Sequence, residues 1–148
     1  MDFSAPATAL AGRYTAANCP APANTSAIRT STALPENALP PQPCVLTFLE
    51  GVSFTTGNGT RKAVVEYRVR FYYAEATDLM RDAVALLAYA GVLANALKGA
   101  AQLSGTANVD KATLDHLDVG LLPYAARTYS GIELTVMLTM TEGWVATA

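Results

Sequence analysis

Residues 64–91 read VVEYRVRFYYAEATDLMRDAVALLAYAG, and this stretch decides the fold because two structural patterns follow one another in it. Apolar side chains alternate with charged or polar ones over residues 65–73, which is the period of a half-buried β-strand. From residue 79 onward, apolar residues recur at spacings of three and four, as in a helix with one buried side. A strand followed directly by a helix predicts a chain that mixes both structures.

The strand at 62–73 has a predicted antiparallel partner immediately before it. Residues 44–54 read CVLTFLEGVSF, an apolar strand pattern, and the Gly57-Asn58-Gly59 triplet supplies the positive φ angles of a tight hairpin. One face of 62–73 should meet the core, and the other should meet water or a polar partner. The core face contains Val65, Tyr67, Val69, Phe71 and Tyr73, and the opposite face contains Glu66, Arg68, Arg70 and Tyr72.

A long helix is predicted from residue 79 to residue 97, and Thr77 or Asp78 can cap its start. Polar residues such as Arg81 and Asp82 mark its expected solvent side. The helix should therefore cover one face of the sheet. Its expected buried stripe consists of Leu79, Ala83, Leu86, Leu87, Ala90, Leu93, Ala94 and Leu97.

Two further strands are predicted at 112–122 and 132–141, with a turn at PYAARTYSG, residues 123–131. The last strand has the clearest alternation of apolar and polar residues in the chain. The predicted fold is α+β in the order α-β-β-α-β-β. It is a mainly antiparallel four-stranded sheet that is covered on one face by the long helix.

The N-terminal part is predicted to lie outside this core. Residues 1–17 indicate a short helix with Ser4 as N-cap, and residues 18–43 contain enough prolines to form an extended connector. Within the connector, residues 27–34 could form one short edge strand. The whole chain, 1–148, fits a single domain, with the sheet and helix core at 44–148.

Composition excludes several classes of protein. Hydrophobic residues make up 51% of the chain and charged residues 15%, which argues against disorder and leaves apolar surface for a partner. The net charge of -2 offers no basic excess for a phosphate backbone. Asp2 stands where a secretory signal would carry positive charge, and the uncharged stretch 83–97 is shorter than the ~20 residues of a membrane span. We expect no membrane partner. Cys19 and Cys44 could form a disulfide, but without a secretory signal two free thiols are favoured.

No catalytic, metal or cofactor constellation is readable. On a strand, the single histidine His116 shares a face with Asp118 alone, so we expect a structural or surface role for it. No serine lies in a G-x-S-x-G elbow, so a nucleophilic triad has no support. A basic strip beside Tyr72 could suit single-stranded nucleic acid, but a solvated strand face or a subunit contact explains the same residues. The strip consists of Arg61, Lys62, Arg68 and Arg70.

Four stretches together resemble the tail terminator proteins of long-tailed, siphovirus-like bacteriophages. They are ALPENALPPQPCVLTFLEGVSF, YRVRFYY, LANALKGAAQLSG and YSGIELTVMLTMTEGW. The similarity extends over about residues 1–145, and Tyr129, Ser130 and Gly131 are its most recognisable point.

The resemblance implies a structural protein of the virion without enzymatic activity or cofactor. Such proteins form a homohexameric ring that caps the tail tube and joins it to the head-tail connector. The expected partners are therefore copies of the chain, the tail tube protein and the connector protein, while DNA only passes through the channel. The expected location is the tail-neck junction, after assembly in the host cytoplasm. Contacts with subunits or partners are expected at Arg61, Glu66, Arg68, Arg70, Tyr124, Arg127, Tyr129 and Trp144.

Three alternatives remain open. Another neck component, a head-tail stopper or adaptor, would also be small, acidic and ring-forming. A small ligand-binding or hydrolytic α+β domain would need a pocket with convergent polar groups, and His116 or Cys44 would be its expected member. A single-strand-binding protein is the third alternative, and the negative net charge disfavours it.

Overall fold

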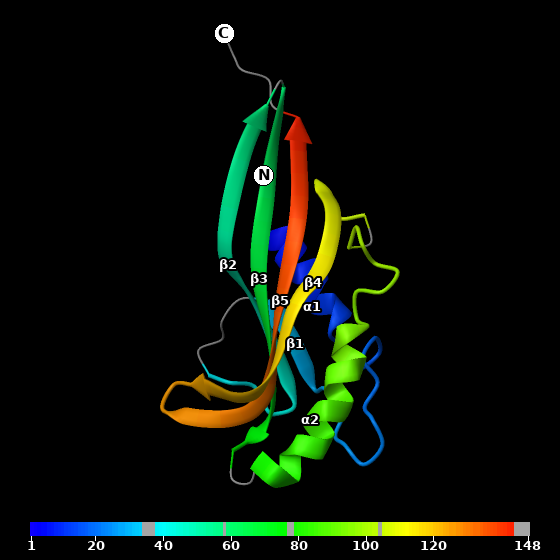
Figure 1. The fold of residues 1–148 in the computed structure, drawn as a ribbon, viewed down its shortest axis with the longest axis vertical. Coiled ribbons are helices and arrows are strands. Elements are labelled where there is room, and N and C mark those ends of the chain that lie inside the picture. Colours follow the sequence, from blue (N-terminus) through cyan, green and yellow to red (C-terminus); the bar gives the residue numbers. More distant parts are fainter. Residues whose placement is uncertain (34–37, 58, 77–78, 104, 144–148) are drawn as a thin grey trace.

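A computed structural model describes residues 1–33, 38–57, 59–76, 79–103 and 105–143. It contains one five-stranded mixed sheet and two helices (Figure 1). The sheet order is β1-β2-β3-β5-β4, in which β1 is parallel to β2 and all other neighbours are antiparallel. The elements are α1 (Ser4–Arg13), β1 (Thr30–Ala33), β2 (Cys44–Gly57), β3 (Thr60–Glu75), α2 (Leu79–Ala94), β4 (Val109–Tyr124) and β5 (Arg127–Gly143).

The predicted four-stranded antiparallel sheet under one long helix is wrong. The possible edge strand within 27–34 exists as β1, and its parallel pairing with Cys44–Thr47 makes the sheet mixed. The predicted long helix is shorter than expected, since α2 ends at Ala94 and turns follow it. Strand is the main secondary structure, because β2 to β5 each contain 14 to 17 residues, while the two helices contain 10 and 16.

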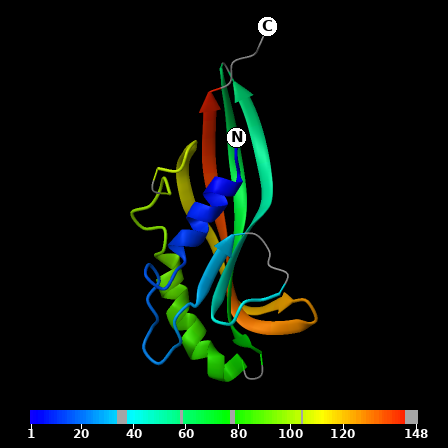
Figure 2. The same cartoon turned by 180° about the vertical axis from the view of Figure 1, so that it is seen from behind.

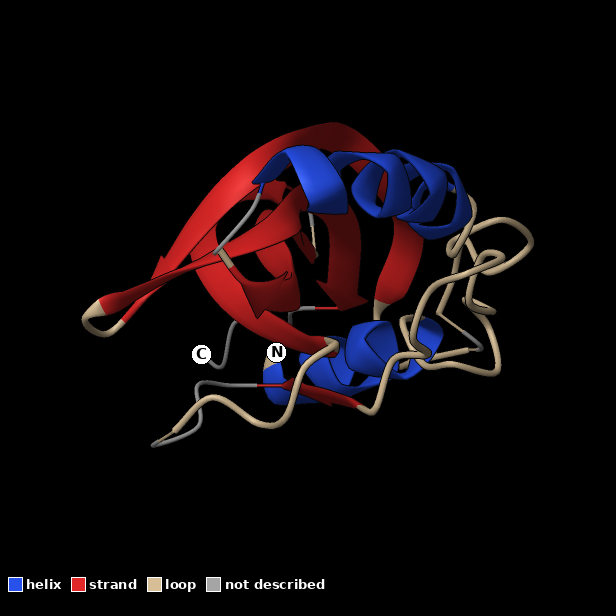
Figure 3. Ribbon diagram, turned by 90° about the horizontal axis from the view of Figure 1, so that it is seen from below, coloured by secondary structure: helices blue, strands red, loops and turns tan. Residues whose placement is uncertain are grey.

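Both helices cover the same face of the sheet, here called the inner face. The side chains of Val65, Tyr67, Val69 and Phe71 are fully buried there, as the alternation in β3 predicts. They share one apolar cluster with Leu10 of α1 and with Leu86, Tyr89 and Leu93 of α2. Because the sheet twists strongly, α1 packs near β1 and β2 while α2 packs over β4 and β5 (Figure 3).

The rotation of α2 differs from the prediction in two informative positions. Leu87 was expected in the buried stripe but is 67% exposed. Asp82 was expected on the solvent side but is only 5% exposed, and its carboxylate accepts a hydrogen bond from Ser130 at 2.7 Å. The helix turns its Asp82, Leu86, Tyr89 and Leu93 side towards the sheet, because this hydrogen bond satisfies the buried carboxylate.

The predicted turn at 123–131 lies at the right place but is much shorter than expected. The β4–β5 hairpin continues to a tip at Ala125 and Ala126, where Ala125 adopts a positive φ of 54°. This hairpin swings away from the helices in Figure 1, and its base closes a second apolar cluster on the outer face of the sheet. The cluster consists of Cys44, Leu46, Tyr72, Leu122 and Tyr129, with Leu39 and Tyr124 packed against it.

The predicted caps have mixed outcomes. Phe3, not Ser4, is the N-cap of α1, and Asp2 accepts hydrogen bonds from the backbone and hydroxyl of Ser4. The predicted caps of α2, Thr77 and Asp78, lie outside the described residues.

Figure 2 shows α1 and β1 on the side of the sheet that is hidden in Figure 1, beside the arm formed by β2 and β3.

Candidate assembly surfaces

A ladder of opposite charges crosses the outer face of the sheet. Glu133 of β5 accepts a hydrogen bond from Arg68 at 2.8 Å and another from Arg70 at 2.7 Å. Arg68 also reaches Glu66 at 3.3 Å, and the guanidinium of Arg70 lies 4.9 Å from the centre of the Phe48 ring. Burial is the largest single influence and would lower the pKa of both guanidinium groups, but the hydrogen bonds and charges of their partners, Glu133 first among them, together outweigh it and raise both pKa values.

This ladder brings together three of the predicted contact residues, Glu66, Arg68 and Arg70. Their side chains remain between 29% and 31% exposed, so a partner can still reach them. Each arginine already has a carboxylate partner, which keeps the surface polar and ordered before any partner binds.

Arg61 does not belong to this face. The side chain of Arg61 points to the same face as those of Ala63 and Val65, because alternate residues of β3 point to the inner face. Its guanidinium hydrogen-bonds to Glu142 and lies 5.2 Å from the centre of the Phe54 ring. The predicted basic strip of four residues is therefore divided between the two faces of the sheet.

The carboxylate of Glu142 supplies a pH-dependent contact at this end of the arm. Its pKa is lowered from the ordinary 4.5, first by a hydrogen bond from the N-terminal amine at 3.0 Å and then by Arg61. A carboxyl group whose pKa is lowered by folding stabilises the fold above its unfolded pKa. That contribution is lost as the pH falls through the folded pKa.

Substitution of Glu142 with glutamine should therefore lower Tm at pH 7 by no more than about 3 °C, because an ion pair that stays partly open to solvent contributes little. The difference from the unmodified protein should shrink as the pH falls below 4.5. Thermal unfolding at several pH values measures both effects. Glu50→Gln, on an exposed carboxylate of β2, is the matched control, and an equal pH-dependent loss there would contradict the assignment.

The predicted contact residues of the β4–β5 hairpin are only partly available. Tyr129 is 8% exposed, and its ring meets the Tyr72 ring edge-on at 5.7 Å. Tyr124 contacts the same ring edge-on at 5.9 Å and is half-buried. Arg127 lies 3.4 Å from Glu75 on the exposed surface. Tyr129 therefore stabilises the base of the hairpin as a buried residue and is not available for a partner. Trp144, the last predicted contact residue, lies outside the described residues.

Exposed apolar side chains form a feature that the sequence reasoning missed. Met80, Val84 and Leu87 are 84%, 77% and 67% exposed, and their spacing places them on one side of α2. The sequence signal that could have revealed them is the spacing of Met80, Val84 and Leu87, which are i, i+4 and i+7 and form a second apolar stripe beside the buried one. In the described part of the chain, the other large exposed apolar residues are Leu49, Phe54 and Val64 on the β2–β3 arm and Val119 and Leu121 on β4.

Both edges of the sheet are open in the described part of the chain. β1 pairs with β2 only at Cys44–Thr47, so no described strand covers the outer edge of β2 beyond Thr47. β4 forms the other edge over its full length. Exposed strand edges present N–H and C=O groups that can pair with another chain.

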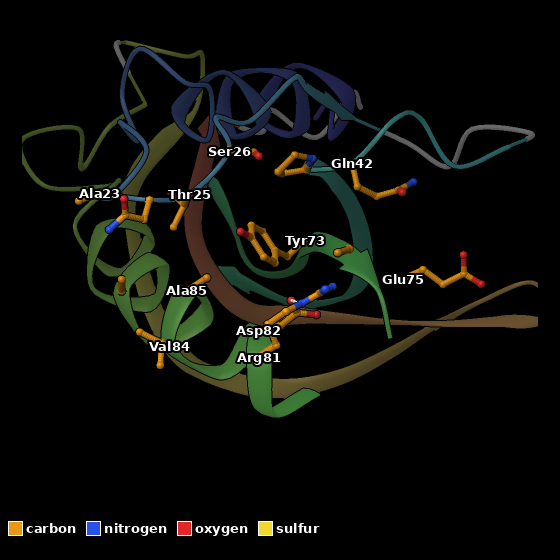
Figure 4. Close-up of a pocket in the computed structure, with 14 residues that line it drawn as sticks. Ala23, Thr25, Ser26, Gln42, Tyr73, Glu75, Arg81, Asp82, Val84 and Ala85 are labelled. Atoms are coloured by element: carbon orange, nitrogen blue, oxygen red, sulfur yellow. Dashed lines mark ion pairs between the residues drawn. The ribbon is translucent and has the colours of Figure 1, made fainter. Parts of the chain in front are cut away.

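A cavity of about 600 Å³ lies between α2, the connector and the end of β3 (Figure 4). Tyr73, Arg81 and Asp82 point towards it, together with the connector at Ala23 to Ser26. Arg81 Nε lies 3.8 Å from Asp82 Oδ1, while Asp82 Oδ2 accepts the hydrogen bond from Ser130. The carboxylate of Asp82 is therefore already engaged on both oxygens.

Neither residue that was predicted for a ligand pocket lines this cavity. His116 is 63% exposed on the outer face, 3.0 Å from Asp118. Cys44 is buried in the outer cluster and Cys19 in the inner one, so the two free thiols lie on opposite faces. Burial raises the pKa of each thiol to about 11, which makes the reactive thiolate rare near neutral pH.

Among the described residues, no group of three or more metal-ligating side chains lies close enough together to hold a metal ion. Within that same part of the chain, none of the helices is both long and apolar enough to span a membrane. No protein-family model matches the sequence, and a search of curated proteins finds no significant match.

Proposed function

We propose that this chain is a self-assembling structural protein of a bacteriophage virion, a tail terminator that forms a ring on the tail tube. The observation that carries the proposal is the placement of exposed apolar side chains near both edges of an open sheet. A closed ring with head-to-tail contacts requires two different surfaces on each subunit. Contiguous exposed apolar side chains are typical of sites that bind other proteins.

The charged outer face supports the same role. Glu66, Arg68, Arg70 and Glu133 present both signs of charge on one ordered surface. Such a surface favours a specific orientation of a partner, since wrongly placed partners bring like charges together. We assign this face to the tail tube protein or to the head-tail connector protein.

The identity of the particle rests on the resemblance of the sequence to tail terminator proteins, above all in the YSGIELTVMLTMTEGW stretch. On that basis the ring has six copies, joins the tail tube to the connector, and encloses a channel through which DNA passes. It acts at the tail-neck junction of the virion after assembly in the host cytoplasm, without catalysis or cofactor. A stopper or adaptor ring has the same surface requirements, and its different position in the particle would distinguish it.

A ligand-binding domain is the second candidate, and the cavity beside α2 favours it. Such a domain has no need to assemble, so it should remain a monomer at concentrations where a ring forms. The two candidates therefore differ in native mass.

Light scattering after size exclusion tests the proposal directly. We expect a species of about six times 15.5 kDa, visible as rings by electron microscopy. Particles produced without this protein should contain tails that do not join to heads. A 15.5 kDa monomer, both alone and with tail tubes from such particles, would refute the proposal.

A further inference from the structure

In the described part of the chain, each edge of the sheet contains a regular stretch of seven residues with no strand on its outer side. On β2 this stretch is residues 51–57, and on β4 it is residues 116–122. We propose that the β2 stretch of one subunit pairs with the β4 stretch of the next as antiparallel strands, so that the sheet continues around the ring. This inference rests on the proposed function and adds the contact surfaces and the partner, a second copy of the chain.

The β2 stretch has none of the features that usually protect an unpaired edge. β1 covers the outer edge of β2 only at residues 44–47, and a bulge at Glu50 interrupts the strand. From residue 51 to residue 57 the pairing with β3 is regular, and the stretch contains no charge and no proline. Unpaired edge strands are usually blunted by charges, prolines or bulges, so this stretch suits an added strand.

β4 is protected over its first half only. It has bulges at Asp110 and Asp115, and the backbone N–H of Ala112 donates to a carbonyl of the loop after α2. Bulges and covering loops prevent another strand from pairing there. Residues 116–122 are regular again, and Pro123 follows them. The open stretches of the two edges therefore have the same length.

Strand direction favours an antiparallel contact between these two edges. The neighbours β2, β3, β5 and β4 are antiparallel in turn, so β2 and β4 of one subunit run in opposite directions. A head-to-tail contact repeats this order in the next subunit, so β4 meets the next β2 in the opposite direction. Both helices then lie on the same face of the continued sheet, as they do within one subunit.

Alignment of the two stretches end to end also matches their faces. It places Phe54 opposite Val119, and both point to the inner face, because their partners within the subunit, Ala63 and Ile132, are fully buried there. Phe54 is 52% exposed and Val119 is 41% exposed, and aromatic and β-branched residues form favourable cross-strand pairs. Arg61 contacts the Phe54 ring from β3, which lies on the side of β2 away from the open edge.

The charges around this contact are compatible with it. The β2 stretch has none, and the β4 stretch has Asp118 on the outer face, 65% exposed beside His116. The alignment places Asp118 opposite Thr55, whose partner on β3 is Lys62. The contact therefore brings a positive charge towards the Asp118 carboxylate on the outer face, and no like charges lie opposite each other.

Opposite charges at the paired positions test the contact. Phe54→Lys and Val119→Glu each place a charge in the inner-face pair, and we expect each alone to weaken association by at least about 30-fold, because burying an unpaired charge is costly. An equimolar mixture of the two variants should regain assembly. Rings in which they alternate contain only pairs of lysine with glutamate and of phenylalanine with valine.

Val64→Lys is the matched control, because Val64 is 44% exposed on the same arm but points to the outer face of β3. This protein should assemble as the unmodified protein does. Circular dichroism verifies that each variant is folded, and light scattering measures the native mass. If the unmodified protein assembles and Phe54→Lys assembles equally well, or the mixture stays monomeric, the inference fails and the proposed function stands.

Hydrogen exchange provides a test that does not depend on the charged variants. Peptides that span residues 51–57 and 116–122 should exchange part of their amide hydrogens at least about tenfold more slowly in the ring than in protein diluted until it is monomeric, because added backbone hydrogen bonds protect amides. Unchanged exchange in both stretches of an assembled ring would overturn the inference. If the unmodified protein stays monomeric with and without tail tubes, the inference and the proposed function both fail.

Discussion

Substitution of Gly131 with alanine is expected to lower the free energy of unfolding by about 3 kcal/mol or more. A Cβ at this position would lie 2.2 Å from the backbone oxygen of Phe71 and 2.7 Å from Cδ1 of Leu122. The backbone oxygen belongs to the central strand β3, so it cannot move without disturbing the register of three strands. Urea unfolding of the purified variant measures the loss.

Gly120 is the matched control for this prediction, because it is the direct cross-strand partner of Gly131 on β4. A Cβ at Gly120 would meet nothing within 4 Å. We therefore expect Gly120→Ala to change the free energy of unfolding by no more than about 0.5 kcal/mol. Equal effects of the two substitutions would show that the close approach at Gly131 does not hold the sheet together.

Gly131 also explains how the hairpin tip is placed. The register of β3 against β5 shifts between Tyr72 and Ala74, next to the pairing of Tyr72 with Gly131. Such bulges bend a strand and increase its twist. The bend places Tyr72 and Tyr129 in the outer cluster. This cluster anchors the β4–β5 hairpin, which carries Tyr124 and Arg127 near its tip.

Local alternation predicted the inner face of the sheet correctly. Val65 to Phe71 in β3 and Ile132 to Met140 in β5 are buried at every second position, because both strands lie under helices on one face. The parallel strand β1 was recognised only as a possible edge strand. It contains four residues, and its pairing depends on a connector that returns across the sheet, which no local pattern records.

The predicted buried stripe of α2 is correct at Leu86 and Leu93 and wrong at Leu87, because the helix has two apolar stripes. A pattern of spacings cannot distinguish the stripe of Leu86 and Leu93 from that of Val84 and Leu87. The tertiary hydrogen bond between Asp82 and Ser130 decides between them. Glu66, Arg68 and Arg70 of β3 were placed on the correct face, but the pairing of the two arginines with Glu133 joins positions 65 and 63 residues apart and is visible only in the structure.

Replacement of Tyr89 by alanine is the second change with a large expected effect. Tyr89 is fully buried, its ring lies 4.6 Å from that of Phe71, and its hydroxyl donates to the backbone carbonyl of Ser26 in the connector. Removal of such a side chain should lower the free energy of unfolding by about 3–5 kcal/mol. Urea unfolding measures this loss as well.

Tyr89→Phe separates the hydroxyl from the ring. This variant keeps the packing against Phe71, so we expect a loss of only about 1 kcal/mol from the missing hydrogen bond. That bond ties the connector to α2, and Arg29 is an exposed trypsin site three residues after Ser26. Tyr89→Phe should therefore be cleaved faster by trypsin after Arg29 than the unmodified protein.

Tyr67→Phe is the matched control for the connector. Tyr67 is equally buried, and its hydroxyl donates to the carbonyl of Phe3, which precedes α1 and lies outside the connector, at 2.6 Å. Its loss should cost about the same free energy, because both variants remove one hydrogen bond from a buried tyrosine. Cleavage after Arg29 should remain as slow as in the unmodified protein. If both variants accelerate that cleavage equally, trypsin acts on the globally unfolded chain, and the Tyr89 hydroxyl does not hold the connector locally.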